Sequence, residues 1–295
     1  MSLLLKSKNK IFLDLIKKVE KALKNEINFM GNKTSLRDAC EYALLNGGKR
    51  FRPLIVLLIA KTLNKNYEPI EAALACEFFH TASLIADDLP CMDDEKIRRD
   101  KPALHLKFSE STAILASYSL ISCGYELIYK NAKTLEKFLP KAESNNICML
   151  AIETVSKYAG IHGATGGQFL DLFAKEVSLD QIIEIIHKKT ISLFEISFVL
   201  GWIYGGGNLN KLDLIKKCSY HFGMAFQIAD DIKDFDEDFK KNKNLNIAIA
   251  LGKKQAKERF NNEIIKTKDL LKQLNLFSTE FFTLIDFLER KLSKF

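Results

Sequence analysis

The chain has 295 residues, of which 47% are hydrophobic, and its 44 basic and 37 acidic residues leave a net charge of +7. This composition provides enough apolar surface for a sizeable core, and the basic excess is too small and too dispersed to indicate a nucleic-acid-binding protein. No stretch reaches the roughly 18 uncharged apolar residues of a transmembrane helix, and the opening sequence MSLLLKSKNK lacks the apolar core of a signal peptide. We therefore expect neither feature.

The six cysteines show neither a CxxC motif nor the spacing of metal ligands, and several of them lie in apolar helical runs. Such cysteines are typical of buried thiols in a reducing compartment. We therefore expect a cytoplasmic protein.

In chain order, the first predicted element is an amphipathic helix over residues 10–29, where apolar residues recur at helical spacing. Gly31 ends this helix. Ser35 can cap the next helix, which runs to the glycine pair at residues 47–48.

Two prolines then occupy positions that suit the first turn of a helix. Pro53 opens a helix that runs through Leu63, and Pro69 opens another over residues 70–88. The second of these helices is apolar on nearly every face, so we expect it to be central and buried.

Further helices are predicted at about residues 109–130 and 145–160. The glycine-rich sequence GIHGATGGQ, residues 160–168, then interrupts the helical pattern.

The last third of the chain continues the helical pattern. Ser178 and Gln181 form a capping box for a helix that reaches Trp202. A long helix begins near Leu212, and two more follow Asn246. Because no segment alternates with period two between turns, we expect no strands and a single all-helical domain.

Two acidic stretches resemble each other: LIADDLPCMDD, residues 84–94, and QIADDIKDFDED, residues 227–238. If the apolar runs before them are helices, the carboxylates lie at or near helix C-termini, where the helix dipole is already negative. Cations must then neutralise them, so we interpret the two stretches as two halves of one metal site. A pair of solvated acidic helix ends is the alternative interpretation.

The spacing of the second stretch limits which oxygens can converge. Asp230 and Asp234 share a helix face, whereas Asp231 points about 100° away. An EF-hand is excluded, because Phe239 and Leu245 stand where its loop requires Gly and Glu.

The first stretch contains Pro90, which prevents a regular helix through the cluster. A bend must therefore bring Asp93 back beside Asp87. Hard oxygen ligands of this kind favour Mg²⁺, bound through a few carboxylates and completed by the phosphates of a substrate.

Phosphate requires basic partners, and the motifs GGKRFRP and DEKIRRDKP supply them. Lys49 and Arg52 are three residues apart at a predicted helix start, where free N–H groups also favour an anion. Arg98 and Arg99 follow the first acidic cluster. A nucleotide-binding P-loop is excluded, because Arg50 replaces the required Ser or Thr.

Five motifs occur in the order GGKRFRP, FFHTASLIADDLPCMDDEKIRRDKPALH, GGQFLDL, KKTISLF and FGMAFQIADDIKD. Their order and spacing resemble those of the trans-isoprenyl diphosphate synthases, of the farnesyl and geranylgeranyl diphosphate synthase type, over roughly residues 35–260. The resemblance implies an all-α fold of antiparallel helices around a central apolar cavity, a single synthase domain over residues 1–295, and a homodimer.

The resemblance also implies the reaction. These enzymes use Mg²⁺, which Mn²⁺ could replace, to condense isopentenyl diphosphate with dimethylallyl, geranyl or farnesyl diphosphate. The implied metal ligands are Asp87, Asp88, Asp93, Asp230, Asp231 and Asp234. The implied catalytic residues are Asp87, Asp93, Lys189 and Asp230.

The two substrates have separate implied sites. The allylic diphosphate would bind Arg98, Lys189, Thr190 and Gln227. Isopentenyl diphosphate would bind Lys49, Arg52, His80 and Arg99. His80 could equally be a satisfied core residue, and only its place in the His-Thr pair of the motif favours a substrate role. Gln168 and Asp171 are expected to bond across helices near the metals.

One segment departs from the family. These enzymes usually carry a GKxxGxD phrase after the second acidic cluster, and this chain has DEDFKKNKNLNIAIALG. Lys240, Lys241 or Lys243 could supply the missing positive charge.

Product length depends on what blocks the cavity below the first cluster. Related enzymes that make fifteen-carbon products often carry a bulky aromatic residue five positions before Asp87, where this chain has Ala82 beside Ser83. Phe79 and Phe78 lie about one helical turn deeper, a rise of ~5.4 Å that matches roughly one isoprene unit. We therefore expect a twenty-carbon product. Leu115 or Tyr118 on another helix could instead enforce a fifteen-carbon product.

Three other functions fit parts of the sequence. A terpene cyclase shares the first acidic motif but lacks a second diphosphate site and usually alters the second cluster. A non-catalytic subunit of a prenyl synthase is favoured only by the altered segment after Asp234. A basic nucleic-acid-binding protein would show salt-sensitive binding without Mg²⁺.

Overall fold

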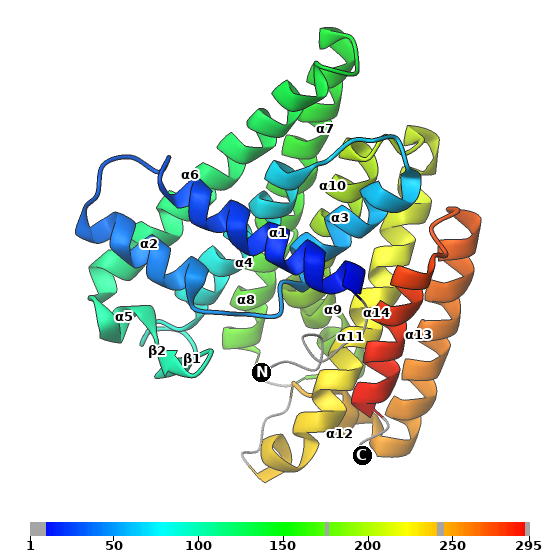
Figure 1. Ribbon diagram of the computed structural model, residues 1–295. Helices are drawn as coiled ribbons and strands as arrows, with labels where there is room; N and C mark the ends of the chain where they lie inside the picture. The colour runs from blue at the N-terminus through cyan, green and yellow to red at the C-terminus, as the bar shows by residue number, and fades with distance from the viewer. Residues whose placement is uncertain (1–9, 175–176, 241–244, 293–295) are drawn as a thin grey trace. The chain divides into compact units, whose positions relative to one another are not determined.

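The computed structural model describes residues 10–174, 177–240 and 245–292, and nearly all of the regular structure in them is helical (Figure 1). The expected all-α class is confirmed. The chain forms two compact units: the first contains described residues 10–154 and 200–206, and the second contains 155–199 and 207–292. The single-domain organisation stays a prediction. None of the described helices is long and apolar enough to cross a membrane.

The first unit follows the predicted order of helices closely. Its elements are α1 (Lys10–Ile27), α2 (Ser35–Leu45), α3 (Phe51–Leu63), α4 (Ile70–Asp87), β1 (Ile97–Arg98), β2 (Lys101–Pro102), α5 (Leu104–Lys107), α6 (Glu110–Leu135) and most of α7 (Lys141–Ala159).

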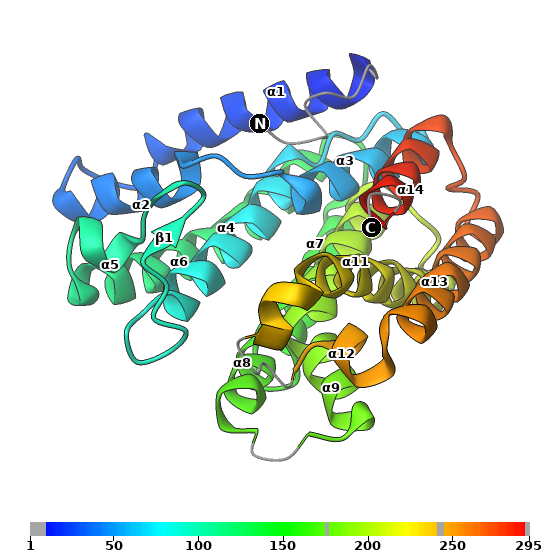
Figure 2. The ribbon, with the colours of Figure 1, turned by 90° about the horizontal axis from the view of Figure 1, so that it is seen from below.

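Helix α4 is the buried helix of this unit, as its apolar sequence predicts. Every residue from 72 to 79 is buried. The helix packs along α6 and also against α3, and both ribbon views show these helices side by side (Figures 1 and 2). Gly124 on α6 permits the close approach, because a Cβ atom there would lie 2.7 Å from the ring of Phe79. Phe79 also meets Tyr125 edge to face, with ring centroids 5.3 Å apart.

Two local predictions for this unit are wrong. Thr34, not Ser35, caps α2: Thr34 has an extended backbone that lets its hydroxyl accept a hydrogen bond from the Arg37 N–H at 3.3 Å, whereas Ser35 is already helical. The second error concerns strands, because Ile97 pairs with Pro102 in a two-residue antiparallel ladder. A ladder this short is not visible as a period-two pattern.

The second unit is built on one long helix. Its elements are α8 (Ala164–Phe173), α9 (Leu179–Ile186), the π-helical turn η1 (His187–Ile191), α10 (Ser192–Tyr204), the 3₁₀ turn η2 (Leu209–Lys211), α11 (Leu212–Lys240), α12 (Ile247–Leu251), α13 (Lys253–Gln273) and α14 (Thr279–Leu292). Helices α7 and α10 each cross the boundary between the units. Helix α11 runs beside α13 and also contacts α12, α14 and η1 (Figures 1 and 2).

The capping box at the start of α9 is confirmed. The Ser178 hydroxyl accepts a hydrogen bond from the Gln181 N–H at 3.3 Å, and the Gln181 side chain accepts one from the Ser178 N–H at 2.9 Å. The predicted single helix to Trp202 is interrupted, however, because the π-helical turn η1 separates α9 from α10.

The glycine-rich sequence 160–168 does not simply break the helical pattern, because α8 begins inside it at Ala164. A Cβ atom on Gly167 would lie 2.2 Å from the backbone nitrogen of Lys189. The glycine is therefore required for the close packing of α8 on η1.

Three helices, rather than the predicted two, follow Asn246, because Gly252, with φ +79°, separates α12 from α13. Asn246 is buried and organises this turn. Its side-chain oxygen accepts hydrogen bonds from the N–H groups of Ala248 and Ile249, at 2.8 and 3.0 Å. Its amide nitrogen donates to the Asp231 carbonyl at 2.9 Å.

Replacing Asn246 with Ala removes both the cap of α12 and its link to α11. We expect this change to lower the free energy of unfolding by about 3 kcal/mol, the sum of a lost cap and a buried carbonyl left without its donor. Urea unfolding monitored by circular dichroism measures the loss. Asn208→Ala, which removes the exposed cap of η2, is the control and should cost less than about 1 kcal/mol. Equal losses in the two variants would contradict the assignment.

Candidate active site

The first carboxylate cluster lies at the C-terminal end of α4, as predicted. Asp87 is the last residue of the helix and Asp88 is its C-cap. The chain then bends back, because the backbone N–H of Asp93 donates to the Asp87 carbonyl at 2.9 Å. The bend inferred from Pro90 is therefore confirmed at the level of the backbone.

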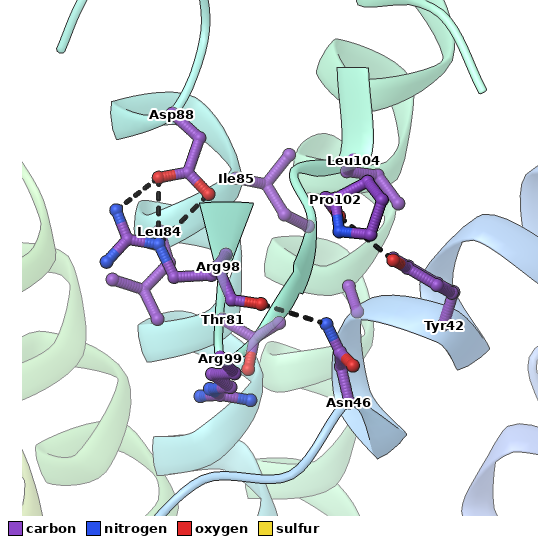
Figure 3. Close-up of a pocket in the computed structure, with 11 residues that line it drawn as sticks. Tyr42, Asn46, Thr81, Leu84, Ile85, Asp88, Arg98, Arg99, Pro102 and Leu104 are labelled. Carbon is purple, nitrogen blue, oxygen red and sulfur yellow. Dashed lines mark hydrogen bonds and ion pairs between the residues drawn. The ribbon is translucent and has the colours of Figure 1, made fainter. Parts of the chain in front are cut away.

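Asp88 is buried and holds Arg98. The Arg98 Nε atom lies 2.9 and 3.1 Å from the two carboxylate oxygens, and Nη2 also contacts Oδ1 (Figure 3). Burial raises the pKa of Asp88, and the hydrogen bonds and charge of Arg98 oppose that rise. The guanidinium group is thus fixed beside the cluster.

The β1–β2 hairpin that carries Arg98 is fastened to α2. Asn46 donates a hydrogen bond to the Arg98 carbonyl at 3.2 Å, and the Tyr42 hydroxyl donates to the Pro102 carbonyl at 2.9 Å (Figure 3). A cavity of about 30 Å³ lies between these residues and Asp88.

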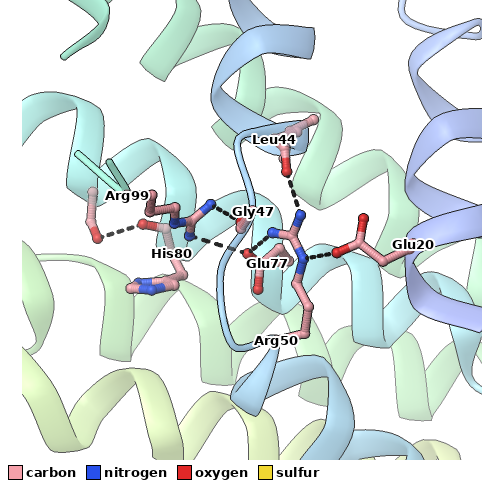
Figure 4. A network of polar contacts seen from close by, with 8 residues as sticks. Glu20, Leu44, Gly47, Arg50, Glu77, His80 and Arg99 are labelled. Atoms are coloured by element: carbon pink, nitrogen blue, oxygen red, sulfur yellow. Dashed lines mark hydrogen bonds and ion pairs between the residues drawn. The ribbon is translucent and has the colours of Figure 1, made fainter. Parts of the chain in front are cut away.

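A second polar network surrounds Glu77, a buried residue of α4 (Figure 4). Arg50, itself buried, donates to Glu77 at 2.5 Å, to Glu20 at 2.7 Å and to the Leu44 carbonyl at 2.6 Å. Neither Arg50 nor Glu77 was predicted to be a site residue. Glu77 is one of only two acids that precede the aspartates in a largely apolar helix, and this was the available signal, since a buried carboxylate requires a buried cation.

Arg99 joins the same network from the hairpin. Its Nη1 atom donates to the Gly47 carbonyl at 2.7 Å, and Nη2 lies 3.4 Å from Glu77 (Figure 4). Burial lowers the pKa of Arg99, and burial lowers that of Arg52 to about 10, with Glu77 opposing the shift in both cases. Arg50, Arg52 and Arg99 therefore gather around Glu77, and this concentration of guanidinium groups suits an anion.

His80 lies beside these arginines on α4. Its Nδ1 atom is buried and has no hydrogen-bond partner among the described residues. Burial, with Arg52 as the next cause, holds the pKa of His80 well below its ordinary value of 6.5, so the imidazole is neutral. Three of the four residues expected to bind isopentenyl diphosphate thus lie in one charged environment: Arg52, His80 and Arg99. The fourth, Lys49, is exposed in the loop before α3.

The second cluster is only partly where the prediction placed it: Asp236 and Asp238 lie near the C-terminus of α11, as expected, and its first members do not. Asp230 and Asp231 lie well inside α11, which continues to Lys240, because apolar and charged residues still alternate at helical spacing after the cluster. Asp230 is partly exposed and forms an ion pair with Lys291 of α14. Asp234 is also partly exposed and pairs with Lys233.

Asp231 is buried on the other side of α11, as its angular offset predicts. One carboxylate oxygen accepts a hydrogen bond from the Gln227 side chain at 2.7 Å, and the other accepts one from the Ile247 N–H at 2.8 Å. Burial raises the pKa of Asp231 to about 6. Gln227 and Asp231 therefore hold each other and the start of α12.

Lys189 and Thr190 both lie, half-buried, on the π-helical turn η1. Lys189 forms an ion pair with Asp171 of α8, so the expected bond from Asp171 across helices is present. Of the lysines expected to supply charge after the second cluster, Lys240 ends α11, and Lys241 and Lys243 lie outside the described residues.

The residues expected to set product length are mostly buried. Phe78, Phe79 and Ala82 are at most 4% exposed. Ser83 is half-buried, and its hydroxyl donates to the His80 carbonyl at 2.9 Å. Leu115 and Tyr118 are exposed on α6.

Within the described parts of the chain, no group of three or more His, Cys, Asp or Glu side chains is arranged to hold a metal ion. Mg²⁺ does not require such a group, because proteins often bind it through one or two carboxylates while phosphates and water complete the shell. Asp87 and Asp93, joined through their backbones, and Asp230 are donors of this kind. Asp230 already binds one cation, the ammonium of Lys291. The residues therefore fit a divalent cation that arrives with a diphosphate.

Comparison with known proteins identifies the class to which this fold and site belong. Residues 33–256 match the family model described as polyprenyl synthetase. Farnesyl diphosphate synthase of Bacillus subtilis is 34% identical over 224 residues, which cover 74% of this chain and 73% of that protein. Geranylgeranyl pyrophosphate synthase 11 of Arabidopsis thaliana is 35% identical over 212 residues, or 70% of this chain and 57% of that protein.

A solved structure agrees. Geranyltranstransferase of Thermotoga maritima superposes with a TM-score of 0.79 at 29% identity, covering 95% of this chain and 98% of that one. The chain belongs to the polyprenyl synthetase family. The resemblance predicted from its motifs is confirmed.

Replacing Glu77 with Gln keeps the shape of the side chain and removes the charge that Arg50 and Arg99 share. We expect the free energy of unfolding to fall by about 3–5 kcal/mol, because the buried guanidinium of Arg50 loses its buried carboxylate partner and keeps only Glu20 and the Leu44 carbonyl. Urea unfolding measures the loss. Glu68→Gln breaks an exposed pair with Lys18 and is the matched control, expected to cost less than about 1 kcal/mol. Wild-type stability in the Glu77 variant would refute its role.

Proposed function

We propose that the protein is a Mg²⁺-dependent trans-prenyltransferase that condenses isopentenyl diphosphate with an allylic diphosphate to give products of fifteen to twenty carbons. The observation that carries the proposal is the arrangement along α4. His80 lies beside the arginines, and Asp87 lies where the chain bends back toward Asp93. The two residues are seven positions apart, which is two helical turns or about 10.5 Å along one face. One helix thus carries a cationic site and a carboxylate site of the kinds that two diphosphate substrates require.

The cationic site suits isopentenyl diphosphate, which the reaction does not ionise. Arg52 and Arg99 would neutralise its diphosphate, and Lys49 could reach it from the exposed loop. His80 is held neutral by the low pKa of its imidazole, so it would contribute a hydrogen bond without adding charge.

The carboxylate sites suit the allylic diphosphate because they would bind it through Mg²⁺. Asp87 and Asp93 in the first unit and Asp230 in the second would hold Mg²⁺ ions, with Asp88, Asp231 and Asp234 in support. Bound Mg²⁺ supplies positive charge that stabilises the departing diphosphate. Arg98, fixed by Asp88, and Lys189, fixed by Asp171, would add to this charge. Thr190 and Gln227 would complete the polar side of the site.

The reaction follows from this division. The allylic C–O bond breaks and its electron pair leaves with the diphosphate. The double bond of isopentenyl diphosphate then attacks the allylic cation and forms the new carbon–carbon bond. A proton is lost to the released diphosphate, so no protein carboxylate is required as a base. The apolar residues of α4 would keep water from the cation.

We propose a twenty-carbon product, with fifteen carbons as the alternative. Ala82 and Ser83 leave space where a bulky aromatic residue would stop the chain early. Phe78 and Phe79 would form the floor of the pocket about one turn deeper. The close packing of Phe79 on Gly124 supports this role, because it leaves the ring little freedom to move aside.

We also propose a homodimer in the cytoplasm. Helix α6 has no charged residue between Glu110 and Glu126, yet several of its apolar side chains in that interval are exposed: Ile114, Leu115, Tyr118 and Ile121. An uncharged apolar face of this kind suits a second copy of the chain. The six cysteines are all free thiols in the described residues, which suits a reducing compartment.

Incubation with Mg²⁺, isopentenyl diphosphate and each of the three allylic diphosphates tests the function. Chromatography of the dephosphorylated products should show a C20 alcohol, and Asp87→Ala should lower the rate by at least ~100-fold, because the departing diphosphate loses its charge stabilisation. A product that stops at C15 would retain the chemistry and refute the pocket argument. No product from any substrate would favour a non-catalytic subunit.

Replacing Ala82 with Tyr tests the pocket. The phenol ring would fill about one isoprene unit of space, so we expect the main product to shorten from C20 to C15. The same chromatography measures the change, and circular dichroism checks that the variant is folded. Ser83→Tyr, rotated by about 100° on the same helix, is the comparison. Unchanged products from Ala82→Tyr would show that Ala82 does not face the cavity.

A further inference from the structure

Lys291, near the end of α14, is a lysine in an unusual place. Its side chain is only 7% exposed, and its ammonium forms an ion pair with Asp230 of α11. The same ammonium lies 4.9 Å from the centre of the Phe226 ring. Asp230 and Phe226 are four residues apart on α11 and share one face of the helix, so together they form one binding site for a cation.

The position of Lys291 on the buried face of α14 places its side chain in this binding site. The buried apolar residues of the helix form a stripe that contacts the rest of the unit: Phe281, Leu284, Ile285 and Leu288. Lys291 continues the stripe three residues after Leu288, where an apolar residue would be expected. Its neighbour Arg290 faces outward instead, is 72% exposed and pairs with Asp286 of the same helix. A lysine on the buried stripe requires a specific partner.

The partner is the carboxylate that the proposed function assigns to Mg²⁺, and the inference rests on that function for the identity of the metal. We propose that Lys291 is a built-in counter-ion of Asp230. Its ammonium neutralises the carboxylate when no divalent cation is bound, and it leaves the carboxylate when a divalent cation is coordinated. Lys291 is thus a positioning residue that tunes cation binding.

Two consequences follow from this competition. A divalent cation must displace the ammonium from Asp230. The protein therefore binds the cation more weakly than it would if Asp230 had no ammonium partner. The displaced ammonium keeps its contact with the Phe226 ring and becomes available to an anion that accompanies the metal, such as a diphosphate. Lys291 would thereby add a cation in a chain whose segment after the second cluster lacks the usual GKxxGxD phrase.

Titration of the free protein with Mn²⁺, followed by electron paramagnetic resonance without any isoprenoid, tests the proposal. The Asp87→Ala background removes the first cluster from the signal. Lys291→Met, which preserves the length of the stem, should bind Mn²⁺ at least roughly fivefold more tightly, the lower end of typical coupling between two ligands. Arg290→Met is the matched control and should bind as the parent does. Lys291→Arg, which retains the charge, should also behave like the parent.

Thermal unfolding gives a second readout. Mg²⁺ should raise the melting temperature of Lys291→Met more than that of its parent, because a ligand stabilises the folded state by RT ln(1 + [L]/Kd), which increases as Kd falls. Adding Asp230→Asn should abolish both differences. Equal Mn²⁺ affinity with and without Lys291, or no binding in either protein, would overturn the proposal. Because the titration contains no substrate, a failure to form prenyl products leaves its outcome unaffected.

Discussion

The buried carboxylate of Glu77 balances the arginines at the cationic end of the first unit. Arg50, just before α3, donates a hydrogen bond to Glu77, and Arg99, just after β1, approaches it. Both arginines have a left-handed backbone conformation, with φ of 51° and 54°. Charged groups removed from water are tolerated only when they are paired. The pairing therefore fixes three separate segments, the loop before α3, the hairpin and α4, in one arrangement. The pairing also gathers several guanidinium groups in one place, and this concentration of positive charge makes the site suitable for an anion.

The same construction recurs at three of the charged groups proposed to form the site. Asp88 holds Arg98, Asp171 holds Lys189, and Gln227 and Ile247 hold Asp231. In each case a neighbouring side chain or backbone group fixes the orientation before any ligand binds. Preorganised charges of this kind stabilise a transition state without the free-energy cost of turning solvent or side chains during the reaction. The site is therefore built from pairs, although the sequence motifs display single residues.

The sequence predicts the helices well because their signals are local: helical spacing of apolar residues, prolines in first turns, and the capping box at Ser178. The first acidic cluster and its bend were predictable for the same reason, since Pro90 restricts the backbone. The pairs were not predictable, because Glu77 with Arg50 and Asp230 with Lys291 join residues far apart in sequence. The π-helical turn η1 was also missed; the close approach of Gly167 to the Lys189 backbone in this turn joins two residues 22 positions apart, which no local pattern reveals.

The seven-residue interval between His80 and Asp87 on α4 sets the distance between the cationic site and the carboxylate cluster. Because a helix advances 1.5 Å and turns by about 100° with each residue, the interval fixes both a spacing and a direction. Removing or inserting one residue between these positions would rotate the carboxylate cluster away from the cationic site by more than a quarter of a turn. Evolution can therefore vary the side chains along this interval, and with them the depth of the pocket, but the number of residues in it is constrained.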